Sequence, residues 1–289
     1  QPAWLDRFAP LALLAGMLAF TIQLSRLAAQ KAAGLMPEWP LDLTFFHNLV
    51  WNVARGHGYR QSASYHEPPG IWNETHFEPI LVLVAPVYAL FPTINTLFVV
   101  QAALLALGAA GVYRLARSGG AAPRFAAGAG LVFLTYWPLW RMALADVRPL
   151  IWSIPFLLLT AAALRERRLN ETLVWGALAC LCREEIPILL VGLGAASWFW
   201  SHRQPGATWS RDPGVRLALA ALSFFALATS LRSNAGFYIR PAEWISGLLS
   251  GGDGGAAAQW GREPAELLGV RLRFLGQWLI PAGAGALLA

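Results

Sequence analysis

The sequence predicts an all-α, polytopic integral membrane protein, from its composition, its long apolar blocks and the placement of its arginines. Charged residues make up 13% of the 289-residue chain and hydrophobic residues 56%. Soluble domains carry about 25% charged residues. The composition excludes a disordered chain and a disulfide scaffold. The net charge of +6 suggests a polyanion partner, but loop arginines that set membrane orientation explain it better, so no nucleic acid is expected.

Apolar blocks follow one another along the chain, and a spanning helix needs about 20 mostly apolar residues. The block 171–200 is too long for one span, and the charged run 183–185 interrupts it, so two helices are expected to meet there. The block 77–91 is short and rich in proline, which favours a re-entrant or interfacial element. The blocks lie at 8–28, 77–91, 94–113, 125–142, 149–164, 171–200, 215–231 and 267–288.

Short arginine-rich loops predict the orientation, because such loops stay on the cytoplasmic side. Three of them alternate with pairs of apolar blocks and should share that side; they hold Arg114, Arg117 and Arg124, then Arg165, Arg167 and Arg168, then Arg203, Arg211 and Arg216. With 77–91 re-entrant, the chain has about eight spans and a cytoplasmic N-terminus, which Arg7 also favours. If 77–91 spans, the N-terminus lies on the other side.

The extracytoplasmic face is then expected to hold two loops of a single transmembrane domain, 1–289. The first loop, 29–93, contains a predicted amphipathic helix at 41–54 as well as the re-entrant element, and the second loop is 232–266. The chain begins at Gln1 and stops inside an apolar run, so we expect an excerpt of a longer protein.

Polar chemistry concentrates in the first loop. Asp42 is expected either to cap the amphipathic helix, worth about 1 kcal/mol, or to activate an acceptor hydroxyl at the membrane surface. His66 with Glu67, and His76 with Glu78, stand beside prolines. Imidazole with carboxylate can bind Zn²⁺ or Mn²⁺, or sugar hydroxyls. His66, Glu67 and His76 are therefore metal candidates, although their spacing matches no known metal motif and a solvated loop is the alternative; no cofactor is assigned.

Two turns place further charges at the same predicted face. Asp146 and Arg148 lie between two spans, as a local ion pair or as the lining of a polar cavity. Arg183 and Glu184 lie at the break in the longest block, where a surface turn is the alternative to a cavity. Arginine at such a cavity suits a phosphate, and carboxylates suit general-base work. Together these residues indicate an enzyme that acts on a phosphate-bearing lipid.

Three stretches carry a family resemblance. They are LDLTFFHNLVWNVARGHGYRQ at 41–61, THFEPILVLVAPVYALFPTINTLFVVQAALLALGAAGVYRLAR at 75–117 and ALACLCREEIPILLVGLG at 177–194. The chain resembles, over roughly 40–200, the bacterial predicted membrane proteins grouped as domain of unknown function 2079. That family is similar in layout to the GT-C glycosyltransferases, which use polyprenyl-phosphate sugars.

The resemblance implies roles for several residues. Asp42 matches the acidic residue that follows the first span in those transferases and serves there as catalytic base or as a metal-linked group. His76, Glu78 and Pro79 look like the element before their interfacial helix, and Asp146 looks like the acid of an outer turn. Arg183 matches a basic residue near the lipid phosphate. Many relatives have paired acids in the first loop, and their absence here argues against a metal-dependent mechanism.

The resulting hypothesis is a membrane glycosyltransferase of GT-C type that transfers a sugar from a polyprenyl-phosphate donor at the extracytoplasmic face. In it, Asp42 is the base, Arg183 and Arg148 hold the lipid phosphate, and His76 and Glu78 bind the sugar or a metal. Two alternatives stay open, a non-catalytic accessory or scaffold subunit bound to partner chains, and a transporter of a lipid-linked substrate.

Overall fold

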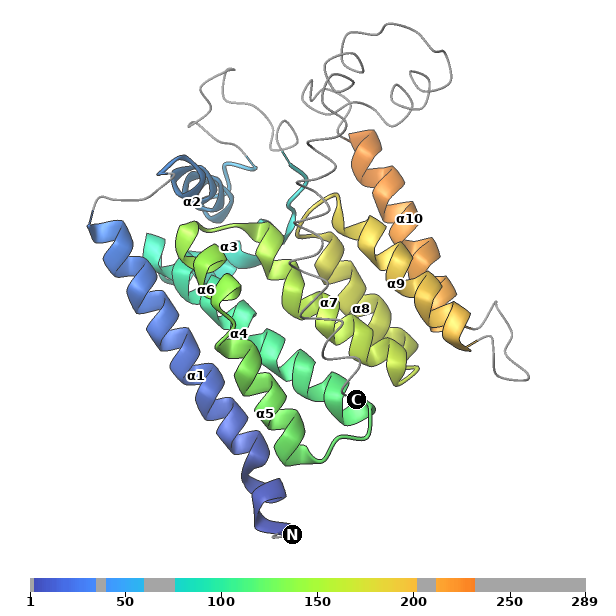
Figure 1. Cartoon of the computed structure of the whole chain (residues 1–289). Helices are drawn as coiled ribbons and strands as arrows, with labels where there is room; N and C mark the ends of the chain where they lie inside the picture. The colour runs from blue at the N-terminus through green and yellow to red at the C-terminus, as the bar shows by residue number, and fades with distance from the viewer. Residues whose placement is uncertain (1–2, 35–39, 60–75, 202–211, 232–289) are drawn as a thin grey trace, which may run out of the picture. The chain divides into compact units, whose positions relative to one another are not determined.

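The computed structural model describes residues 3–34, 40–59, 76–201 and 212–231, and these form ten α-helices without a strand (Figure 1). The all-α prediction is therefore confirmed for the described part of the chain. The predicted loop at 232–266, the apolar block at 267–288 and the candidates His66 and Glu67 lie outside it. The helices are α1 (Ala3–Ala33), α2 (Pro40–Ala54), α3 (Ile80–Leu90), α4 (Ile94–Ser118), α5 (Pro123–Leu134), α6 (Trp137–Ala145), α7 (Pro149–Arg165), α8 (Leu169–Cys180), α9 (Ile186–Ser201) and α10 (Pro213–Leu231).

Two of these helices are long and apolar enough to cross a membrane. They are Leu5–Ala33, within α1, and Ile94–Ser118, which is α4. One side of α1 exposes a stripe of large apolar side chains, at Phe8, Leu11, Leu14, Leu18 and Ile22, which suits contact with lipid. The other apolar helices are shorter, so the count of eight spans stays a prediction.

The predicted division of the longest apolar block is confirmed. It forms α8 and α9, and the charged residues lie in the turn 181–185 between them. The predicted amphipathic helix at 41–54 is also present, as α2. The prolines of 77–91 leave α3 with 11 residues, about 16 Å at 1.5 Å per residue, roughly half of the hydrocarbon thickness.

The block 125–142 is expected to be one helix, but the structure divides it into α5 and α6. The cause is Pro138, which lacks the N–H that would bond the carbonyl of Leu134 and whose ring crowds that carbonyl. The indole Nε1 of Trp140 donates to the Leu134 oxygen instead, at 2.6 Å. This bond compensates for the one that proline removes, so the break is stable in apolar surroundings.

Helix α4 is the centre of the packing, with α1, α5 and α7 against it, while α8 packs on α7 and α10 packs on α9. Small residues permit close approach between helices. At Gly130 on α5, an added Cβ would meet the Ala109 oxygen of α4 at 2.8 Å. At Gly194 on α9, it would collide with the Gly214 oxygen of α10.

Polar contacts define two ends of this helix assembly. At the end where α1 begins, ion pairs join Asp6 to Arg124, Arg114 to Glu166 and Arg167 to Asp212. These pairs bring together the described parts of the three predicted arginine-rich loops. At the other end, which we call the turn end, two turns meet residues of α1, α4 and the segment 76–80. One is the turn 143–148, made of the last three residues of α6 and the connection 146–148, and the other is the turn 181–185.

Candidate functional site at the turn end

The segment 76–80 is fixed to the turn 181–185 by backbone hydrogen bonds. The N–H of Phe77 donates to Oε2 of Glu184 at 2.9 Å. The N–H of Ile80 donates to the carbonyl oxygen of Leu181 at 2.9 Å. Ile80 begins α3, so its N–H has no intrahelical acceptor. The loop end of α3 and the break between α8 and α9 therefore form one structural unit.

Three side chains in this unit form a hydrogen-bonded chain. The Nη2 of Arg183 lies 2.8 Å from Nε2 of His76, and the Nδ1 of His76 lies 3.0 Å from Oε1 of Glu184. A guanidinium can only donate, so Nε2 of His76 must be the acceptor and Nδ1 carries the proton that is donated to Glu184. Both imidazole nitrogens are engaged in this arrangement, and a metal would have to displace Arg183 or Glu184 to bind His76.

Glu184 is a buried, ionised carboxylate. Its exposed fraction is 5%, and burial alone would raise its pKa. The hydrogen bonds from His76 and from the Phe77 backbone outweigh burial and lower the pKa of Glu184 to about 2. Hydrogen bonds to the charged form thus keep a negative charge beside Arg183. That charge in turn orients the imidazole of His76.

Glu78 also belongs to this unit and is 3% exposed. The hydroxyl of Tyr59, from the residues after α2, donates to the backbone oxygen of Glu78 at 2.8 Å. Burial and the nearby charge of Glu78 raise the pKa of Tyr59. Tyr59 therefore connects the first-loop helix α2 to the segment that carries His76 and Glu78.

The turn 143–148 is organised by Gln101 of α4, a buried residue. The Nε2 of Gln101 donates to the carbonyl oxygens of Ala143 and Asp146, at 3.0 and 2.9 Å. Its Oε1 accepts from the backbone N–H of Arg148 at 3.0 Å. This side chain thereby sets the backbone on both sides of Asp146, whose own side chain accepts from the Val147 N–H.

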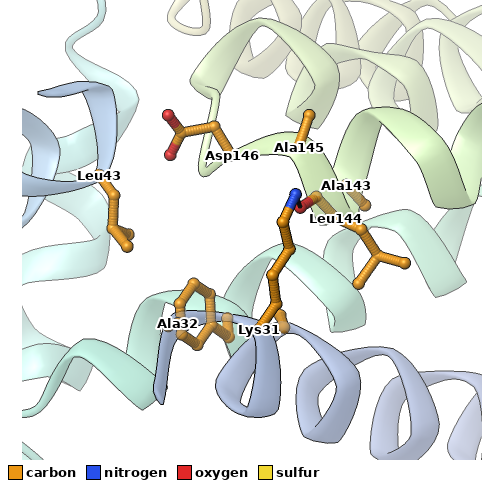
Figure 2. A pocket seen from close by; sticks show the side chains of 9 residues that line it. Lys31, Ala32, Leu43, Ala143, Leu144, Ala145 and Asp146 are labelled. Atoms are coloured by element: carbon orange, nitrogen blue, oxygen red, sulfur yellow. Dashed lines mark hydrogen bonds between the residues drawn. The ribbon is translucent and has the colours of Figure 1, made fainter. Parts of the chain in front are cut away.

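A small pocket opens beside this turn (Figure 2). It is lined by Ala28, Lys31, Ala32, Leu43, Phe98, Ala143, Leu144, Ala145 and Asp146. Lys31 reaches from α1 and donates from Nζ to the carbonyl oxygen of Leu144 at 3.0 Å. Leu43 comes from the first turn of α2. The pocket therefore joins α1, α2, α4 and the turn that carries Asp146.

The structure brings some predicted site residues together and separates others. His76, Arg183 and Glu184 are in direct contact, with Glu78 in the same segment. Asp146 and Arg148 share the other turn, and Arg148 also belongs to the network of Gln101. Asp42 lies in the first turn of α2, and its side chain lies outside the described structure.

The predicted metal site can be compared with the side chains that the structure describes. Within the described ranges, no group of three His, Cys, Asp or Glu side chains is arranged to hold a metal. Cys180 and Cys182 are free and buried, as their place in an apolar block predicts. Sequence reasoning missed Lys31, the single lysine of the chain, and Gln101, an amide inside an apolar block. The only sign of these two residues in the sequence is their type, since each is a polar side chain in or beside an apolar block.

Comparison with known proteins identifies one related protein family. A family model described as "Predicted membrane protein (DUF2079)" matches residues 39–232, more than half of the chain. The matched range includes both turns and the segment 76–80. No curated protein and no solved structure matches the chain.

Proposed function

Because this chain belongs to the family of predicted membrane proteins matched over 39–232, we propose that it is an integral membrane glycosyltransferase of GT-C type. In this proposal it lies in the bacterial inner membrane with a cytoplasmic N-terminus. It transfers a sugar from a polyprenyl-phosphate donor at the extracytoplasmic face, which is the turn end. Partner subunits are compatible with this activity, and no metal is required.

One observation carries the proposal, the gathering of charged groups at the turn end of an apolar helix assembly. Carboxylates of Glu78, Asp146 and Glu184 are all less than 8% exposed there, and Lys31 and Arg183 accompany them. Charged groups in apolar surroundings are costly, so they usually serve a substrate or ion site. A lipid-linked substrate would reach such a site from the bilayer.

Arg183 is assigned the lipid phosphate. Its Nη2 donates to the neutral acceptor Nε2 of His76, and the planar guanidinium has further donors whose geometry suits phosphate oxygens. Glu184 holds His76 from the other side at 3.0 Å. His76 and Glu184 therefore act as positioning residues for Arg183, and Arg148 is the second candidate cation for the phosphate.

Asp42 is assigned the role of general base. It immediately precedes Leu43, which lines the pocket beside Asp146. The acceptor hydroxyl oxygen would form a bond to the anomeric carbon while the bond from that carbon to the phosphate oxygen breaks. The polyprenyl phosphate leaves with the electron pair, and the hydroxyl proton passes to Asp42. The product has inverted anomeric configuration.

The test is sugar release in proteoliposomes. The purified full chain is incubated with a panel of radiolabelled polyprenyl-phosphate hexoses and a membrane extract as acceptor, and label leaving the donor lipid is counted. The wild type should release label from at least one donor, and Asp42→Asn should abolish release while the protein stays folded. Asp6→Asn, at the opposite end, is the matched control and should release label like the wild type. Label retained across the whole panel by the wild type, or normal release by Asp42→Asn, overturns the proposal.

A further inference from the structure

We infer that the pocket between α1, α2, α4 and the turn 143–146 receives hydroxyl groups of the sugar, with Lys31 and Asp146 as the binding residues. The inference rests on the proposed function and deepens it, since it assigns the sugar and the phosphate to different places. Figure 2 shows Lys31 rising from α1 toward the turn, with Asp146 beyond it and Leu43 across the opening.

The pocket combines opposite charges with apolar walls. Its charged groups are the ammonium of Lys31 and the carboxylate of Asp146. Its remaining side chains are apolar, from Ala28 and Ala32 on α1, Leu43 on α2, Phe98 on α4, and the turn. Apolar walls strengthen hydrogen bonds made between them. A ligand with hydrogen-bonding groups can therefore gain much from this small space.

The side chain of Lys31 is held in one position by its hydrogen bond. Its Nζ donates to the Leu144 oxygen at 3.0 Å, and the turn that carries Leu144 is held by Gln101 through the carbonyls on either side, Ala143 and Asp146. The side chain of Lys31 is half-buried. An ammonium held in one place, in the same pocket as the Asp146 carboxylate, is a preorganised polar site, so binding requires little further ordering of side chains.

The charges select hydroxyl groups over phosphate. An anionic phosphate beside Lys31 would also meet the Asp146 carboxylate, and the two negative charges repel most strongly in apolar surroundings. A hydroxyl group both donates and accepts. One hydroxyl of a sugar can donate to Asp146 while it or its neighbour accepts from Lys31, without introducing a charge. The phosphate is assigned to Arg183 in the other unit of the turn end, whose Nη2 donates to an imidazole nitrogen. The carboxylate of Glu185, 3.3 Å from Nε of Arg183, is 47% exposed, so water screens its charge and a phosphate can replace it.

Leu43, which lines the pocket, places it next to the proposed general base, Asp42. Leu43 and Asp42 are consecutive in the first turn of α2. A sugar whose hydroxyl groups enter the pocket would therefore lie against the first helical turn of α2, which carries the proposed base. This proximity is required if the attacking hydroxyl of the acceptor is to meet the sugar at the anomeric carbon.

The single lysine of the chain makes the experiment selective. The full chain in nanodiscs is treated with an amine-acetylating reagent, and the rate of Lys31 acetylation is followed by mass spectrometry. The two probes are geranyl-phosphate hexose and geranyl phosphate, of which only the first carries the sugar. The hexose-bearing probe should slow Lys31 acetylation several-fold, and geranyl phosphate should leave the rate unchanged.

Variants separate binding from structure. Asp146→Asn should keep the ligand-free acetylation rate of Lys31, which reports an intact pocket, and should lose the protection by the hexose-bearing probe. In a retention assay with the tritiated probe, Lys31→Arg should hold the hexose-bearing lipid better than Lys31→Met. Both Lys31 variants should retain geranyl phosphate equally.

The outcomes distinguish this inference from the proposed function. Equal protection by both probes assigns phosphate to Lys31 and overturns the inference, as does protection by neither probe. If sugar release proceeds in proteoliposomes while Lys31 is never protected, the transferase stands and the pocket assignment fails. If Lys31 is protected by the sugar but no donor releases label, the sugar site stands and the transferase fails.

Discussion

The carboxamide oxygen of Gln101 on α4 accepts a hydrogen bond from the indole Nε1 of Trp152 on α7, at 3.0 Å. Gln101 is 2% exposed and Trp152 is 0% exposed. With the bonds to Ala143, Asp146 and Arg148, the carboxamide uses both of its donors and both acceptor positions. One side chain therefore fixes the start of α7 and the turn before it.

Gln101→Leu should lower the free energy of unfolding by about 2–4 kcal/mol, because each buried polar group left without a partner costs about 1–3 kcal/mol. The indole of Trp152 and the N–H of Arg148 would both lose their acceptor. The measurement is denaturant unfolding in detergent micelles, followed by circular dichroism. Val99→Ala on the same helix, at a side chain that is 48% exposed, is the control and should change stability much less. Equal stability of Gln101→Leu and wild type would contradict this account.

The contact between α9 and α10 predicts opposite effects for two glycines of α9. A Cβ at Gly194 would collide with the Gly214 oxygen and lie 3.2 Å from the Cβ of Ala218, whereas a Cβ at Gly192 meets nothing within 4 Å. Gly194→Ala should force the helices apart and lower the unfolding temperature. Gly192→Ala should leave it unchanged or raise it, since alanine favours helix by about 1 kcal/mol. Identical shifts for the two variants would argue against close packing here.

The carboxylate of Glu184 predicts a stability that depends on pH. Its pKa in the fold is about 2, below the ordinary value of 4.5. Its ionised form therefore stabilises the fold above about pH 4.5, and that contribution is lost as the pH falls toward 2. Glu184→Gln should lose on the order of 2 kcal/mol at neutral pH and show a flatter stability profile in acid. Unfolding curves across this range provide the check, with Leu189→Ala on α9, which removes no charge, as the control.

At the end where α1 begins, Asp212 and Arg167 form an ion pair of 2.9 Å whose two partners should differ in importance. Asp212 also accepts from the Ser201 hydroxyl at 2.7 Å and from the Gly214 N–H at 2.8 Å, so it caps α10. Asp212→Ala should lower the free energy of unfolding by about 2–3 kcal/mol. Arg167→Ala should cost less than about 1 kcal/mol, because its guanidinium is half-exposed. Equal losses would show that the ion pair, and not the cap, matters.

Much of the helical order follows from the sequence, because apolar block lengths and charged interruptions are local signals. The turn 181–185 was predicted from three consecutive charges, and α3 was predicted to be short from its prolines. The break at Pro138 was missed because the flanking residues are apolar and the block has the length of one span. A proline alone does not settle the outcome, because α7 continues through Pro155. At Pro138 the helix breaks, and Trp140 donates to the carbonyl oxygen of Leu134 that the break leaves without its helical partner.

The candidate site was predictable only in part. Hydropathy and arginine placement assign Asp42, His76, Asp146 and Arg183 to one predicted face. The contact of His76 with Arg183 and Glu184 depends on how α3 packs against the turn, which no local pattern encodes. No local pattern marks Lys31 as a site residue, because a lysine at the end of a long apolar helix is ordinarily an interfacial anchor. Only the tertiary contact with Leu144 places it in a pocket.

The bond from the Phe77 backbone to Glu184 closes a loop of 107 residues. Loops of that size close late, because the entropy of bringing distant segments together has to be met before the contact forms. During synthesis the ribosome has to make the second half of the described chain before His76 and Phe77 find their acceptor. A nascent chain that stops before the turn 181–185 would therefore insert its first helices without completing this unit of the turn end, so assembly at the turn end follows the order of translation.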